Sequence, residues 1–253
     1  MATTLQVAAH LEGVRAAMVA MVRYADRAGL DAPVPTTPDW TVRRLLAHQG
    51  MVHRWAAAVV TGAAPTPDRW EREGRDSPDP LEWLRDGAIE VVTAISSAPA
   101  DLDAPVFLAD APTPRSFWAR RQCHETTIHA ADALSAALGR YPVAADARWI
   151  GTELALDGID ELLTGFLPRP VSRLRSDDGQ RIAVRPEEGG GGWLVELGAG
   201  PPVTSRFTGA APEAEVELTG SAVAVYLTLW NRSDEASPGG RWDEWRDSAQ
   251  IGW

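Results

Sequence analysis

The sequence lacks lysine altogether, and all 24 of its basic residues are arginines. Chemistry that forms a Schiff base through a lysine side chain is therefore excluded. The 35 acidic residues bring the formal net charge to −11, and no basic run interrupts them. Because a nucleic-acid-binding protein usually carries a basic patch, we expect no nucleic-acid partner.

Cysteine is nearly absent as well, since Cys123 is the single one. An internal disulfide is therefore impossible, and a reducing cytoplasm is the expected location. Long apolar runs are also missing: no stretch is long enough to cross a bilayer, and the N-terminus shows no basic and apolar leader. We expect a cytoplasmic protein with no membrane partner.

The hydrophobic periodicity of the first two thirds of the chain is helical. Helix-like patterns cover residues 5–28, 41–61, 81–97, 114–138 and 149–166. Thr41 is placed to cap the second of these segments, and Gly139 is placed to end the fourth. Residues 65–80 are charged and irregular, which favours a loop. Four long amphipathic segments joined by loops predict an antiparallel bundle.

The pattern changes after Pro168-Arg169-Pro170 to short runs separated by glycine, proline and aspartate. These runs predict strands at residues 171–176, 180–186, 192–197, 203–207 and 213–218. Residues 221–230 then indicate one apolar helix. The four glycines at 189–192 favour a hairpin loop over a phosphate cradle, because no helix follows them. The sequence therefore predicts an α+β protein, with a helix bundle in residues 1–168 and a small antiparallel sheet with a helix in residues 169–253.

A spacing typical of metal ligands occurs in the fourth helical segment. Glu125 and His129 are four residues apart, so their side chains leave the helix within roughly 40° of each other. His48 of the second segment is expected to face inward, and with this pair it would make three ligands. Such a set leaves coordination positions open for catalysis. By ligand type it suits Zn²⁺, Fe²⁺, Ni²⁺ or Co²⁺.

The neighbouring residues limit this interpretation. His124 lies five residues before His129, about 140° around the helix, so these two histidines are not expected to share a metal. The segment is not the zinc-protease HExxH motif, because Ile128 stands where that motif has histidine. Cys123 is expected to be a buried apolar residue rather than a ligand. On the second segment, His53 is expected at the surface.

Two charged residues beside the Glu125 and His129 pair are open to more than one reading. Asp132 follows His129 by about one turn and is placed to orient that ring through a hydrogen bond. Arg121 precedes Glu125 by about one turn, and it either binds an anionic substrate or pairs with Glu125. The alternative to a metal is a set of buried histidines held by hydrogen bonds, with Glu125 paired to Arg121.

Three segments resemble the mycothiol-dependent maleylpyruvate isomerase family, within the broader DinB/YfiT-like metal-binding bundles. Residues 38–48 are similar to the family's "GWTV…LLAH", with Asp39 where glycine is usual. Residues 121–133 are similar to its "R…HE…H..DA". Residues 214–221, followed by 227–232, resemble its C-terminal domain, whose helix often ends in "LWGR"; here Asn231 replaces the glycine.

The resemblance implies a DinB-like antiparallel four-helix bundle followed by a small SCP2-like α+β domain. It also implies a divalent metal, zinc foremost, on His48, Glu125 and His129, with mycothiol or a similar thiol as cosubstrate. Arg232 or Arg121 would hold a substrate carboxylate. The implied activity is isomerisation of, or thiol addition to, a small electrophilic acid. A thiol S-transferase of natural-product or xenobiotic metabolism, or a non-catalytic metal- or ligand-binding protein, is the alternative.

Overall fold

The structure is a computed structural model that describes residues 5–108, 113–239 and 242–249. These residues form two compact units. The helical unit contains residues 5–107 and 113–142, and the sheet unit contains Leu108 and residues 143–239 and 242–249.

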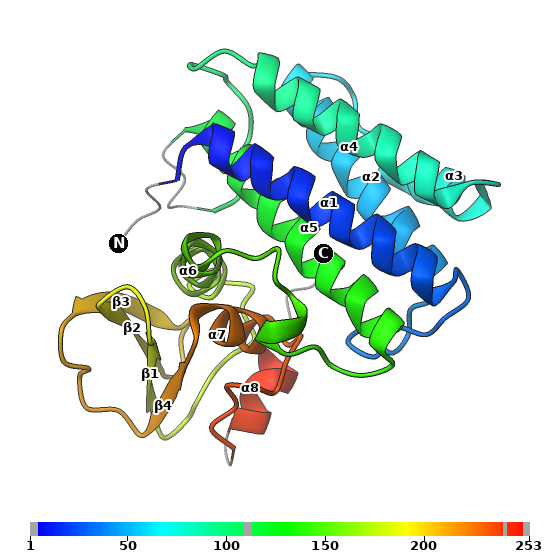
Figure 1. The fold of residues 1–253 in the computed structure, drawn as a ribbon. Helices are drawn as coiled ribbons and strands as arrows, with labels where there is room; N and C mark the ends of the chain where they lie inside the picture. Colours follow the sequence, from blue (N-terminus) through cyan, green and yellow to red (C-terminus); the bar gives the residue numbers. More distant parts are fainter. Residues whose placement is uncertain (1–4, 109–112, 240–241, 250–253) are drawn as a thin grey trace. The chain divides into compact units, whose positions relative to one another are not determined.

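The helical unit is built from four long helices and a short one (Figure 1). They are α1 (Val7–Ala28), α2 (Val42–Thr61), α3 (Pro67–Asp76), α4 (Pro80–Ser97) and α5 (Pro114–Leu138). Helix α1 packs on α5, and α2 packs on both α4 and α5. The four long helices have nearly the predicted bounds, so the predicted helix bundle is confirmed.

The segment between α2 and α4 is a helix and not the loop that its irregular sequence indicated. Helix α3 begins with Pro67 in its first turn and is held by ion pairs one turn apart, with Arg69 Nε 2.7 Å from Glu73 Oε1. Its one buried residue is Gly74, where an added Cβ would lie 2.8 Å from the Trp83 ring. An apolar stripe is thus missing from α3, which is why hydrophobic periodicity failed to predict it.

Helix α5 is the central helix of the helical unit, and every residue from Phe117 to Ser135 is buried. The Thr113 hydroxyl caps its start by accepting a hydrogen bond from the Ser116 amide at 3.2 Å. Its end is at Gly139, whose φ of 67° is in the left-handed region and whose amide donates to the Ser135 carbonyl. The polar side chains of α5 therefore lie inside the unit, where each needs a partner.

The sheet unit contains a four-stranded sheet in the order β3-β2-β1-β4 (Figure 1). The strands are β1 (Gln180–Pro186), β2 (Gly191–Leu197), β3 (Val203–Thr208) and β4 (Val216–Gly220). Strands β1, β2 and β3 pair antiparallel, as predicted, but β4 pairs parallel to β1. The sheet is therefore mixed, because the chain crosses from the β3 edge to the opposite edge before β4 begins.

The helices of the sheet unit are α6 (Thr152–Asp160), α7 (Ala222–Leu229) and α8 (Trp242–Ser248), and a short 3₁₀ turn spans Ala144–Asp146. Helix α6 continues as a π-helical turn, Glu161–Phe166. Helix α7 packs against β1, β4 and α6. The indole of Trp230 donates to the Gly158 carbonyl at 3.2 Å, which ties the end of α7 to α6. The predicted helix at 221–230 is thus confirmed as α7.

Three expectations for the second part of the chain differ from the structure. Residues 171–176 form no strand, and the last strand begins at Val216 instead of residue 213.

The two units divide near Val143, whereas the change in composition placed the boundary at 168. The reason is α6, which continues the helical pattern in sequence but packs in the sheet unit. The predicted hairpin loop lies between β1 and β2 and includes Gly189 and Gly190, both with positive φ, while Gly191 and Gly192 already belong to β2.

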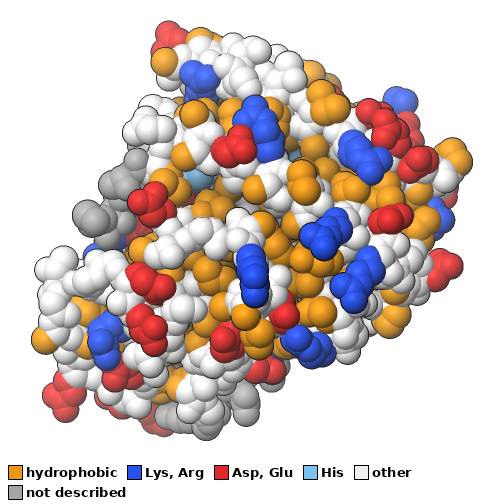
Figure 2. All heavy atoms as spheres, viewed as in Figure 1, with side chains coloured by type: hydrophobic (Ala, Val, Ile, Leu, Met, Phe, Trp, Pro, Cys, Tyr) orange, Lys and Arg blue, Asp and Glu red, His pale blue; other side chains and the backbone are white. Residues whose placement is uncertain are grey.

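Among the described residues, no helix has both the length and the apolar character needed to cross a membrane. The face drawn in Figure 2 mixes acidic, arginine and hydrophobic side chains, and no large cluster of positive charge is visible on it.

Candidate metal centre

Three buried side chains of the helical unit bring their ligand atoms together. His48 comes from α2, and Glu125 and His129 come from successive turns of α5; they are 9%, 6% and 6% exposed. Glu125 Oε1 lies 3.3 Å from His129 Nε2 and 3.8 Å from His48 Nε2. One ligand atom from each residue lies within 4.8 Å of the other two. The structure thus brings together the three residues expected as ligands.

The distances between these atoms fit a small divalent cation. For metal–ligand bonds of about 2.0–2.1 Å in a tetrahedral site, neighbouring ligand atoms are about 3.3 Å apart. Among the described residues, Glu125 Oε1 is buried and has no hydrogen-bond donor in good geometry. An unsatisfied carboxylate oxygen between two imidazole nitrogens is a position that a cation would fill. Two histidines and one glutamate are also a ligand set used by catalytic zinc.

The second oxygen of Glu125 is held by Arg121. Arg121 Nη2 donates to Glu125 Oε2 at 3.1 Å, and the arginine side chain is fully buried. Burial by itself would raise the pKa of Glu125, but the two histidines and Arg121 outweigh it and hold that pKa well below its usual value. Glu125 is therefore ionised, as a ligand has to be. Of the two roles left open for Arg121, the structure shows the pairing with Glu125.

The other ring nitrogen of His129 faces Asp132. His129 Nδ1 lies 2.8 Å from Asp132 Oδ2, and Thr36 Oγ1 donates to Asp132 Oδ1 at 2.6 Å. Burial lowers the pKa of His129, but the nearby carboxylates of Asp132 and Glu125 more than compensate, and the pKa is raised. A proton on Nδ1 leaves Nε2, on the Glu125 side, as the nitrogen available to a cation.

Trp40 lies over the two histidine rings. Its ring centroid is 5.8 Å from that of His129, with 19° between the planes, and 4.8 Å from that of His48. Burial is the largest cause of a lowered pKa at His48, which favours the neutral imidazole that a metal ligand requires. The guanidinium of Arg44 lies over the Trp40 ring, with its central carbon 5.1 Å from the ring centroid.

His53 is fully buried, so its expected place at the surface is wrong. His53 Nε2 lies 2.8 Å from Gln49 Nε2 and 3.0 Å from Thr126 Oγ1, in a polar network between α2 and α5. Burial, assisted by the charge of Arg54, lowers the pKa of His53 to about 3. The spacing of four residues correctly places His53 on the same face of α2 as Gln49. The sequence pattern does not reveal that α5 covers this face.

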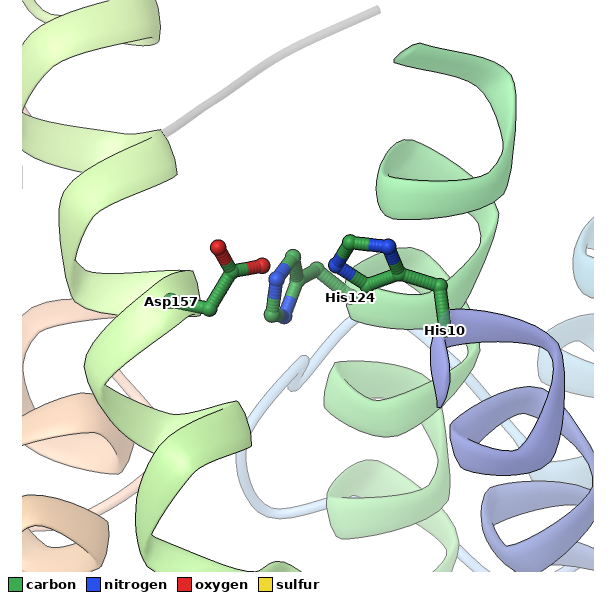
Figure 3. A group of neighbouring side chains, drawn as sticks. All are labelled: His10, His124 and Asp157. Carbon is green, nitrogen blue, oxygen red and sulfur yellow. The ribbon is translucent and has the colours of Figure 1, made fainter. Parts of the chain in front are cut away.

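The remaining two histidines, His10 and His124, lie next to each other (Figure 3). His10 of α1 and His124 of α5 are both buried, and their ring centroids lie 6.2 Å apart in an edge-to-face arrangement. His124 therefore faces α1, in agreement with the argument that it cannot share a metal with His129. Cys123 is fully buried and is in no disulfide, as expected.

Arg232 lies just after α7 in the sheet unit. Its Nη1 donates to the Trp230 carbonyl at 2.8 Å, and the preceding residue, Asn231, has a φ of 61°. Left-handed backbone at this point suits the glycine that the related pattern has there, and asparagine tolerates it. The role of Arg232 toward a substrate stays a prediction.

Sequence reasoning missed two residues of the centre, Thr36 and Trp40. Trp40 stands immediately before the helix cap Thr41, in the same family-like segment, residues 38–48, that contains His48. That placement could have predicted a contact between Trp40 and His48. Thr36 offered none, because its partner Asp132 is 96 residues away in the chain.

A buried centre of two histidines and a glutamate in a helix bundle, followed by a small α+β unit, defines a two-domain protein with a candidate metal centre. Residues 11–134 match the family model described as the mycothiol maleylpyruvate isomerase N-terminal domain, and residues 153–245 match the corresponding C-terminal domain. The chain belongs to the mycothiol-dependent maleylpyruvate isomerase family, as the three sequence segments indicated.

Solved structures show the same fold. The chain is 17% identical to the mycothiol-dependent maleylpyruvate isomerase, with a TM-score of 0.60 over 93% of this chain and 94% of that one. A histidine-to-alanine mutant of that enzyme is 16% identical, with a TM-score of 0.62 over 92% of this chain and 94% of the other. Among curated proteins, none matches the sequence.

Proposed function

We propose that this protein is a divalent-metal-dependent isomerase that uses mycothiol, or a similar small thiol, to convert a cis double bond of a small electrophilic acid to the trans form. The observation that carries the proposal is the convergence of His48, Glu125 and His129 on Glu125 Oε1, at 3.3 and 3.8 Å. Membership of a family named for this reaction supports the thiol and the substrate class.

The residues of the centre have separate tasks in this proposal. His48, Glu125 and His129 would hold the cation, which we expect to be zinc, and Arg121 keeps Glu125 ionised. A bound divalent cation would supply the positive charge that favours the thiolate of the cosubstrate at neutral pH. A borrowed thiol also suits a chain whose one cysteine, Cys123, is fully buried.

The reaction itself conserves the thiol. The thiolate sulfur adds to one carbon of the cis double bond, and the π electrons move onto the conjugated carbonyl. Rotation about the resulting single bond follows, and the electrons return as the C–S bond breaks. We assign Arg232 the task of holding the substrate carboxylate, because a guanidinium forms paired hydrogen bonds with it and Arg121 is already paired with Glu125.

Metal content tests the first half of the proposal. The purified protein is reconstituted with zinc and measured by elemental mass spectrometry beside His129→Ala and the matched variant His124→Ala, which removes a buried histidine of the same helix. We expect about one zinc per chain in the wild type and in His124→Ala, and none in His129→Ala. Zinc retained by His129→Ala would refute the ligand assignment.

A thiol assay tests the second half. The zinc-loaded protein is incubated with mycothiol and maleylpyruvate, while the substrate spectrum and the free thiol are followed together. A changed spectrum at constant thiol supports the isomerase. Stoichiometric loss of thiol would instead identify an S-transferase, and the absence of thiol binding would leave a binding protein.

A further inference from the structure

The segment between α1 and α2, residues 29–41, is a folded loop that lies against the candidate metal centre. A β-bridge within this loop joins Pro33 to Thr41, and the Val34 amide donates to the Trp40 carbonyl at 3.0 Å. Within it, the Thr37 amide donates to the Val34 carbonyl, and the Trp40 amide donates to the Thr37 carbonyl. The backbone of this loop is thus held by its own hydrogen bonds.

This loop places the Thr36 hydroxyl inside the bundle. Thr36 is 8% exposed, and its Oγ1 lies 2.6 Å from Asp132 Oδ1 and 2.9 Å from Ser135 Oγ. The carboxylate of Asp132 has no proton to give, so the hydroxyl of Thr36 donates to it. The single Thr36 proton is then used on Asp132, and the Ser135 hydroxyl donates its own proton to the Asp132 backbone carbonyl at 2.7 Å.

The opposite oxygen of Asp132 determines what this contact achieves. Asp132 Oδ2 lies 2.8 Å from His129 Nδ1, so one carboxylate is held between a threonine hydroxyl and the histidine ring. A short, charge-assisted hydrogen bond on Oδ1 fixes the rotation of the carboxylate about its side-chain bonds. That rotation decides whether Oδ2 points at His129 Nδ1, and hence which nitrogen of the ring carries the proton.

We propose that Thr36 is a positioning residue of the metal centre: its hydroxyl holds Asp132 in the orientation that keeps the His129 proton on Nδ1 and leaves Nε2 free for the cation. The inference rests on the proposed function, because it takes His129 as a ligand. The inference goes beyond the proposed function because it assigns the α1–α2 loop a part in orienting a metal ligand. Trp40, from the same loop, packs on the face of the same ring at 5.8 Å between centroids.

The test compares Thr36→Val, which keeps the side-chain shape and removes the hydroxyl, with Thr36→Ser, which keeps the hydroxyl. Zinc dissociation constants of the metal-free proteins are measured by competition with a chromophoric chelator. Changes to the partners of metal-bound histidines typically weaken metal binding about 10–100-fold, and we expect about a tenfold loss in Thr36→Val. Thr36→Ser should bind within about twofold of the wild type, by the same reasoning.

A second measurement reads the ring directly. In the zinc-loaded wild type, we expect a slowly exchanging Nδ1 proton of His129 in ¹⁵N-resolved spectra, and faster exchange of that proton in Thr36→Val while the backbone amide shifts of α5 stay in place. Equal zinc affinity and equal proton exchange in wild type and Thr36→Val would overturn the inference. An equal loss in both variants would also overturn it, because packing and not the hydroxyl would then matter. A wild type that binds no zinc would instead refute the proposed function.

Discussion

Arg121 Nη2 lies 3.1 Å from Glu125 Oε2, in an ion pair whose side chains are 0% and 7% exposed. One oxygen of Glu125 is therefore occupied by the guanidinium, and the other faces His48 and His129. A buried charge that loses its partner is strongly destabilising, because water cannot replace the lost contact. The three candidate ligands should for this reason respond differently to substitution.

Glu125→Gln should lose both the metal and stability. In the metal-free protein, we expect its free energy of unfolding to fall by about 3–5 kcal/mol, because the substitution breaks the buried ion pair between Glu125 and Arg121. His48→Ala should lose the metal without uncovering a buried charge. Urea denaturation measures the stability, and elemental mass spectrometry measures the zinc.

The double variant Glu125→Gln/Arg121→Met separates the two effects. Methionine fills part of the space of arginine without its charge, so we expect the double variant to regain most of the stability but no zinc. If Glu125→Gln alone unfolds at the wild-type urea concentration, the dependence of Arg121 on Glu125 is refuted.

Trp40 should contribute to zinc binding through the two rings beneath it. Aromatic pairs of this kind are worth about 0.5–1.5 kcal/mol, so Trp40→Ala should weaken zinc binding by up to about tenfold. Trp40→Phe keeps an aromatic face over the ring of His129 and should lose less. Chelator competition gives the affinities. Equal losses in both variants would show that the indole, and not ring stacking in general, is needed.

The stability of the metal-free protein should depend on pH through His53. Its pKa is about 3 in the folded state and 6.5 when unperturbed, so between these values the unfolded chain binds a proton that the folded chain does not. Above about pH 6.5, His53 is neutral in both states and does not lower the free energy of unfolding. Below that pH, the free energy of unfolding falls by about 1.4 kcal/mol per pH unit until the pH approaches 3.

The matched variant for this prediction is His53→Asn, which cannot titrate. Between pH 6.5 and 4.5, we expect the unfolding free energy of the wild type to fall more steeply than that of His53→Asn. The contributions of His48 and Glu125 are present in both proteins and cancel in the difference. Parallel slopes would mean that His53 accepts a proton in the folded state.

Much of the fold could be predicted from the sequence because the bundle helices have short-range signals in the sequence itself. The cap at Thr41 and the stop at Gly139 are short-range signals, and the spacing of Glu125 and His129 is fixed by the helix itself. What failed depends on contacts distant in sequence. His53 is buried by α5, β4 joins the far edge of the sheet, and Thr36 reaches Asp132 across 96 residues. Helix α3 was missed for the opposite reason. Its stabilising contacts are local ion pairs, but it has no apolar stripe from which a helix would be predicted.

The sheet unit has an ion pair between the buried Asp160, at the end of α6, and Arg206 in β3, whose side chain is 29% exposed. Arg206 Nε and Nη2 lie 2.6 and 2.9 Å from the two carboxylate oxygens, and the Trp193 indole donates to Oδ1 at 2.9 Å. The Asp160 side chain is only 2% exposed. This pair therefore joins α6 to the sheet.

Arg206→Ala should destabilise the sheet unit by about 1–3 kcal/mol, because it removes two hydrogen bonds to the buried Asp160 carboxylate. Arg206→Lys restores a charge but not the two-point contact, so its loss should be intermediate. Denaturant unfolding and, separately, scanning calorimetry measure the stability of both variants. The zinc content should equal that of the wild type in each variant, because all three candidate ligands belong to the helical unit. Loss of zinc in folded Arg206→Lys would contradict the assignment of the whole centre to that unit, and full stability in Arg206→Ala would show that Asp160 does not need the guanidinium.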